Sequence, residues 1–168
     1  IRHLMKNQDA LLNRMKKAAG IADVSSCEIL AEIGPDLTAF PTGEAMVSWA
    51  GLCPGNNESA GKRKSGRSPV MKHHLKTIML EVAWAAIKKK DSYFKDKYYR
   101  LKARRGAKKA IVAIAHRILL GVYHVIKDGV EFRDLGEEYL TRRNKSQKIF
   151  HLRKQALSLG FNLVPQTV

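Results

Sequence analysis

Apolar residues recur at helical spacing along most of this 168-residue chain. In residues 70–88 and 108–127 they fall three or four positions apart, so that one face of each helix is apolar and the other polar. The broad apolar face of residues 108–127 predicts the most buried helix. The same pattern, with a larger share of basic residues in the last two, covers residues 2–19, 25–33, 44–49, 88–109 and 137–159. The chain is therefore predicted to be all-α.

Residues that begin or end helices separate these segments. Gly34 and Pro35 stop the second helix, and Thr42 is suited to cap the short helix that follows. Gly106 is expected to end the helix of the basic run, and Gly129 to close the helix over residues 108–127. These boundaries predict short connections between neighbouring helices.

The first two helices are joined by a short turn that contains Gly20. This outline is typical of a helix-hairpin-helix element, in which backbone N–H groups can bind a nucleic-acid phosphate. Because Ala22 stands where the usual pattern has a second glycine, simple packing of two helices is the open alternative. Asp23 or Ser25 is predicted to cap the second helix, and Cys27 to be a small core residue.

Residues 51–69 interrupt the helical pattern. Their glycine, proline, asparagine and serine residues favour turns and oppose both helix and strand, so they predict a loop. Ser59 and Ser65 lie in this loop among fixed positive charges, which stabilise charge that develops on phosphoryl oxygens. The cations are Lys62, Arg63, Lys64 and Arg67. Composition alone favours the simpler alternative, a solvated basic loop that contacts the DNA or RNA backbone.

The helix after this loop begins with Lys72, His73, His74 and Lys76. Positive side chains are unfavourable at the positive end of a helix dipole, so their position predicts an external anion such as a phosphate. The two histidines are adjacent and cannot form a metal pair one helical turn apart. One of them could assist proton transfer at the serine, but a satisfied or solvated histidine is the favoured interpretation. Trp49 is expected to bury its ring beside the loop and anchor it.

The net charge of +16 predicts a polyanionic partner. Arg104 and Arg105, in the basic run, are candidate contacts to that partner. No membrane is expected, because the longest apolar run, residues 110–115, is too short to span one. The two cysteines and the absence of a secretory signal fit the cytoplasm. No paired Cys/His spacing for zinc was found, so no metal site is predicted.

Residues 48–63 read Ser-Trp-Ala-Gly-Leu-Cys-Pro-Gly-Asn-Asn-Glu-Ser-Ala-Gly-Lys-Arg, and residues 72–76 read Lys-His-His-Leu-Lys. These motifs resemble the C-terminal domain of a family of bacterial insertion-sequence transposases, which are guided by a bridge RNA and related to pilin gene-inverting recombinases. The resemblance covers residues 18–139, including a Tyr-Arg-Leu segment that leads to Gly106.

The resemblance implies that Ser59 is a nucleophile that attacks a DNA phosphodiester and holds the strand covalently. Ser65 has no counterpart in the family's motif and is interpreted as a loop hydroxyl. The family's N-terminal RuvC-like domain, with four acidic residues, lies outside these residues. The resemblance further implies that this domain brings Mg²⁺ to a composite site in a homo-oligomer, a dimer or tetramer, that also binds a guide RNA.

Three regions are expected: a helical connector (residues 1–17), the transposase helical domain (residues 18–136) and a basic helical tail (residues 137–168). The tail would lie on nucleic acid or on a second protomer. Since the chain begins with Ile1, we expect a fragment that binds nucleic acid and cuts little by itself. The alternative is a non-catalytic helical module that binds the DNA or RNA backbone; a helical oligomerisation domain would leave the charge unexplained.

Overall fold

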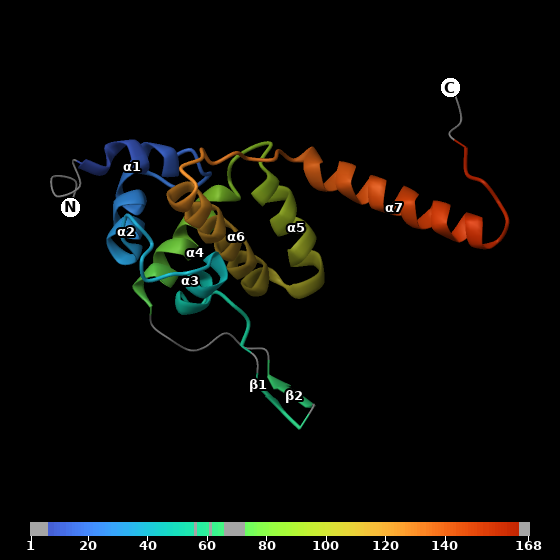
Figure 1. Ribbon diagram of the computed structural model, residues 1–168, viewed down its shortest axis with the longest axis horizontal. Helices are drawn as coiled ribbons and strands as arrows, with labels where there is room; N and C mark the ends of the chain where they lie inside the picture. The colour runs from blue at the N-terminus through green and yellow to red at the C-terminus, as the bar shows by residue number, and fades with distance from the viewer. Residues whose placement is uncertain (1–6, 56, 61, 66–72, 165–168) are drawn as a thin grey trace.

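The computed structural model describes residues 7–55, 57–60, 62–65 and 73–164, and for residues 57–59 and 62–65 it describes the backbone only. Figure 1 shows a body of packed helices from which a β-hairpin and the last helix stand away. The helices of the described residues are α1 (Asp9–Met15), α2 (Asp23–Ile33), α3 (Gly43–Trp49), α4 (His74–Ala86), α5 (Tyr93–Arg105), α6 (Ala107–Lys127) and α7 (Glu138–Ser158). The predicted helical architecture is confirmed.

Helix α6 is the centre of the body and packs against α1, α3, α4 and α5. Ile114, Ile118, Leu119 and Val122 are fully buried, and each contributes about 1.5–3 kcal/mol through burial of its apolar surface. This confirms the prediction of the most buried helix. By length and composition α6 could also cross a membrane, although the sequence pattern pointed only to its shorter apolar run. Here its apolar face packs on the other helices, as expected of a core helix.

The helix boundaries follow from local chemistry. The Thr42 hydroxyl oxygen accepts the Ala45 N–H at 3.1 Å, which confirms the predicted cap of α3. At α2 the Ser25 hydroxyl oxygen accepts the Ala22 N–H at 2.9 Å, whereas Asp23 forms an ion pair with Lys16 at 2.8 Å. The N-cap residue is Ala22, so neither predicted residue occupies the cap position; Ser25 lies at the third position of the helix and bonds back to Ala22 from there.

Three predicted helices are shorter in the structure. α1 ends at Met15, and residues 16–19 form turns in place of the predicted last helical turn. α5 begins at Tyr93, because Asp91 has a left-handed backbone (φ 54°) that interrupts the predicted helix. α4 begins at His74, and the predicted start at residues 70–72 lies outside the described residues.

A β-hairpin occupies the middle of the segment predicted to be a loop. Strands β1 (Asn57–Ser59) and β2 (Lys62–Ser65) pair in an antiparallel manner. The prediction that this segment opposes strand formation is wrong for these residues. Ala60 directly follows β1 and has φ 51°, the left-handed backbone that tight hairpin turns require.

Helix α7 differs from its prediction as an amphipathic helix. Leu140 is its only buried residue, and α7 extends away from the body (Figure 1). The Arg100 Nη2 on α5 donates to the Thr141 hydroxyl at 2.8 Å and fixes the start of the helix. The rest of α7 is therefore a solvent-exposed arm.

Candidate nucleic-acid interface

The segment that carries Ser59 leaves the body at the end of α3 through a fixed turn. The Gly51 N–H donates to the Ser48 carbonyl at 2.9 Å, and the Leu52 N–H donates to the Val47 carbonyl at 3.1 Å. Gly51 has φ 67°, and the Leu52 side chain is buried. The first residues of the segment are thus held by the core.

The segment returns to the body at His73, which precedes the first residue of α4. The rings of His73 and Trp49 meet edge to face with centroids 4.0 Å apart, and the Phe40 and Trp49 centroids are 5.1 Å apart. Trp49, at the end of α3, therefore links the start of the segment to its end through the contact with His73, in agreement with its predicted role as an anchor. The expectation that its ring is buried is wrong, since 40% of the residue is exposed: its partners cover only part of the indole.

His73 and Lys76 lie together at the base of the hairpin segment. The His73 Nδ1 atom is buried and has no hydrogen-bond partner among the described residues. A Cβ atom added to Gly51 would lie 3.7 Å from both Cδ and Nζ of Lys76, so this side chain lies against the start of the segment. Two of the predicted site residues, one just before α4 and one in its first turn, thus lie where the segment meets the body.

The hairpin register defines the surroundings of Ser59. Its Cα atom is paired with that of Lys62, and Glu58 is paired with Arg63. Ser65 is paired with Asn57 at the other end of the hairpin, beyond a shift in register at which β2 has one extra residue, Lys64. Because directly opposed residues share a face of a two-stranded ribbon, Ser59 and Lys62 occupy neighbouring positions beside the turn.

The other predicted contacts are distributed over the chain. Lys64 also lies on β2, whereas Arg67 and Lys72 lie outside the described residues. Arg104 and Arg105 are exposed in the last turn of α5. In Figure 1 the junction of α5 and α6 lies toward the lower edge of the body, the side from which the hairpin extends.

Gly20 packs closely against α4. A Cβ atom at this position would lie 2.2 Å from the Val82 carbonyl oxygen and 2.7 Å from the Ala86 nitrogen. This close approach supports the packing alternative for the first two helices. A phosphate contact at Gly20 stays a prediction.

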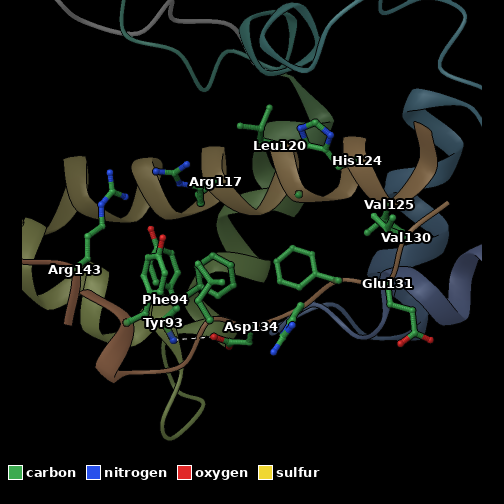
Figure 2. Close-up of a pocket in the computed structure, with 15 residues that line it drawn as sticks. Tyr93, Phe94, Arg117, Leu120, His124, Val125, Val130, Glu131, Asp134 and Arg143 are labelled. Carbon is green, nitrogen blue, oxygen red and sulfur yellow. Dashed lines mark hydrogen bonds between the residues drawn. The ribbon is translucent and has the colours of Figure 1, made fainter. Parts of the chain in front are cut away.

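A second feature, which the sequence pattern did not reveal, is a cavity of about 420 Å³ between α5, α6, residues 130–136 and the start of α7 (Figure 2). Asp134 holds its wall in place. Its carboxylate accepts the Ser92 hydroxyl at 2.7 Å, the Tyr93 N–H at 2.9 Å and the Gly136 N–H at 3.0 Å. Burial raises the pKa of Asp134, but these hydrogen bonds, with nearby Lys89, outweigh it and lower the pKa below its usual value.

A sequence profile of the transposase family described as IS116/IS110/IS902 matches residues 12–99. The match covers just over half of the chain and includes the complete serine hairpin. The chain therefore belongs to this transposase family, which implies a role in transposition and binding to DNA. No curated protein and no solved structure matches the chain.

Proposed function

We propose that this chain is the catalytic-serine part of a transposase or site-specific recombinase, in which Ser59 cleaves and rejoins DNA strands. The observation that carries the proposal is the position of Ser59 beside the turn of a basic hairpin that lies within the matched residues. Lys62 is opposite Ser59 in the register, where a cation can stabilise the charge that develops on the phosphate.

In the proposed step the Ser59 oxygen forms a bond to phosphorus, and the bond from phosphorus to a deoxyribose oxygen breaks. The serine proton is lost, and the released deoxyribose oxygen takes up a proton. The strand is then held as a phosphoserine ester. Attack by a deoxyribose hydroxyl of another strand reverses the step and frees Ser59, so one ester replaces another throughout the exchange.

The remaining residues are assigned to positioning. Lys62 and Arg63 would hold the scissile phosphate, and the contact between Trp49 and His73 would keep the hairpin at a fixed place on the body. Cys53, at the start of the segment, is a poor rival nucleophile. Burial and then the charge of Glu44 raise the pKa of its thiol, so it is protonated near neutral pH.

Among the described residues no group of three or more His, Cys, Asp or Glu side chains lies close enough to hold a metal ion. The proposal assigns Mg²⁺ to acidic residues of a RuvC-like domain of the full-length protein, in a composite site within a homo-oligomer. The net charge of +16 supports DNA and a guide RNA as partners in the bacterial cytoplasm.

The test measures covalent protein–DNA adducts on a nicked substrate, with protein that also carries the RuvC-like domain. Ser59→Ala should lower adduct yield on the order of 10³-fold or more, because no other group replaces the nucleophile. Ser65→Ala is the matched control in the same hairpin and should retain the adduct. DNA affinity of both variants should stay within about 3-fold of the unmodified protein, as expected for one neutral phosphate contact.

An undiminished adduct in Ser59→Ala would place the nucleophile elsewhere. If no variant forms an adduct but charge reversal at Lys62 and Arg63 weakens binding, the result would favour the alternative, a non-catalytic module that binds the nucleic-acid backbone.

A further inference from the structure

The cavity beside α6 has an aromatic lining. Tyr93 and Phe94 of α5 form its buried floor, and Phe132 and Tyr139 are half-buried at its walls. Its volume of about 420 Å³ falls in the range of small-molecule sites. A flat, apolar group the size of a nucleobase fits such a space, and aromatic rings are the usual partners of such groups.

Three guanidinium groups line the same cavity: those of Arg117, Arg143 and, in the 130–136 segment, Arg133. Arg117 of α6 and Arg143 of α7 are both exposed, and neither forms an ion pair with an acidic side chain among the described residues. Arg100 of α5 is not among the residues that line the cavity, and its charge is paired, because the Asp96 carboxylate accepts its Nε–H at 2.7 Å. Glu131 and Asp134 also line the cavity, but the three arginines outnumber these two carboxylates, so the lining keeps a net positive charge.

Lys97 adds to this charge. It is half-buried, and its Nζ lies 5.9 Å from the centroid of the Tyr93 ring, which lines the cavity. Burial, and then the positive charges of Arg117, Arg143 and Arg104, lower the pKa of Lys97. Cations brought this close together are stabilised by an anion with several oxygens, and guanidinium groups bind phosphate through two parallel hydrogen bonds.

We propose that this cavity binds one unpaired nucleotide of an RNA or a single-stranded DNA, with the base on the aromatic walls and the phosphate on Arg117 and Arg143. A paired base is stacked inside a duplex and cannot enter, whereas an unpaired base can turn outward and stack on protein rings. The proposal rests on the proposed function only in that the chain acts on nucleic acid, and it does not involve Ser59.

The surroundings favour a nucleotide within a strand over a free small phosphate. Helix α7 continues from the cavity, and residues 139–164 contain no Asp or Glu. Their cations are Arg142, Arg143, Lys145, Lys148, Arg153 and Lys154. The next phosphates of a bound strand would meet these cations. In Figure 2 α6 lies between the cavity and α3, the helix that leads into the serine hairpin, so the two sites are separate.

The test measures affinity of the full chain for labelled strands of about 20 nucleotides, as RNA, single-stranded DNA and duplex DNA. Arg117→Gln combined with Arg143→Gln removes the two cavity cations that the proposal assigns to the phosphate. Lys145→Gln combined with Arg153→Gln is the matched control, since it removes the same charge from the exposed part of α7. The cavity pair should weaken single-strand binding about 10-fold more than the control pair. Both pairs should weaken duplex binding equally, because backbone attraction depends on total charge.

Leu135→Trp is a second variant that acts without a change in charge. Leu135 lines the cavity and is 49% exposed, so the indole can fill the space while the melting temperature stays near that of the unmodified chain. Single-strand affinity should fall about 10-fold, with duplex affinity unchanged. A 4-thiouridine in the RNA should crosslink to residues 130–143.

If these cavity variants lose more affinity for RNA than for single-stranded DNA, RNA is the source of the nucleotide. If they lose more affinity for single-stranded DNA, DNA is the source. The proposal is overturned if the cavity pair and the control pair weaken single-strand binding equally, or if Leu135→Trp binds single strands normally. Loss of the covalent adduct in Ser59→Ala has no bearing on these results, so the two proposals can fail separately.

Discussion

At the scale of single residues, Gly20 and Gly106 have similar positive φ values for different reasons. Their φ values are 85° and 80°, a region that other residues rarely adopt. A Cβ atom on Gly20 would meet the α4 backbone, 2.2 Å from the Val82 carbonyl oxygen, whereas a Cβ atom on Gly106 would have no neighbour within 4 Å. Gly20 therefore allows the turn between α1 and α2 to approach α4, and Gly106 only allows the chain to turn.

This difference predicts unequal effects of the same substitution. Gly106→Ala should lower the free energy of unfolding by about 1–3 kcal/mol through backbone strain alone, because φ 80° with ψ 161° is a region open mainly to glycine. Gly20→Ala should lower it by about 3–5 kcal/mol, because the strain is joined by a clash with backbone that cannot move aside. Urea unfolding of both variants measures the effects. Equal losses would contradict the assignment of Gly20 to helix packing.

The roles that could be predicted from the sequence are those that depend only on residues nearby in the chain. The cap at Thr42 and the helix end at Gly106 depend on local hydrogen bonding and φ, and both were expected before the structure. The partial exposure of the Trp49 ring could not be predicted, because it depends on Phe40 and His73, which only the folded chain brings to the ring.

At the scale of elements, Asp134 connects residues 130–136 to the start of α5. Its carboxylate accepts hydrogen bonds from Ser92, Tyr93 and Gly136. These bonds lower its pKa despite the opposing effect of burial. The carboxylate therefore stabilises the fold fully above the ordinary carboxyl pKa of about 4, and this stabilisation is lost as the pH falls through the lower pKa of the folded state.

Asp134→Asn should lower the free energy of unfolding at pH 7 by about 1–2 kcal/mol, since the charged acceptor is lost at a partly exposed site. The difference from the unmodified chain should begin to shrink as the pH falls below about 4, where the carboxyl of the unfolded chain becomes protonated, and should be lost as the pH falls through the lower pKa of the native carboxylate. Denaturant unfolding at several pH values measures both effects. A difference that grows on acidification would have the wrong sign for this role.

The exposed part of α7 offers a contrasting prediction. Truncation after Asn144 keeps Leu140 and the bond between Arg100 and Thr141, so the free energy of unfolding should change by less than about 1 kcal/mol, as for exposed positions. Four cations are removed: Lys145, Lys148, Arg153 and Lys154. The slope of log affinity for duplex DNA against log salt should therefore flatten by up to about 4. An unchanged slope would show that α7 does not contact the backbone.

The helices were predictable because each has its own apolar periodicity, whereas the hairpin and residues 130–136 do not. β1 and β2 contain Asn, Glu, Ser, Lys and Arg, with no alternation of apolar and polar positions, and their pairing depends on the tight turn at Ala60. The hydrogen bonds of Asp134 reach residues more than 40 positions earlier. The cavity therefore depends on tertiary contacts that periodicity does not report.

At the scale of the whole molecule, helices packed around an apolar core form a body, and two basic parts, the hairpin and α7, stand away from it (Figure 1). The core around α6 fixes the ends of α3 and α4, and these ends hold the serine hairpin. On the other side of α6, α5 and α7 bring cations to the aromatic cavity. The net charge of +16 is thus distributed over at least two separate surfaces, which suits a protein that holds more than one strand.

The most direct measurement identifies the residue that carries DNA in a trapped adduct. Cleavage after Glu58 and after Lys62 releases the peptide Ser59-Ala60-Gly61-Lys62, whose only side-chain hydroxyl is that of Ser59. After nuclease digestion, our account predicts that mass spectrometry finds a nucleotide on this peptide. A nucleotide on the peptide that contains Ser65, or on any other peptide, would contradict the assignment of Ser59 as the nucleophile.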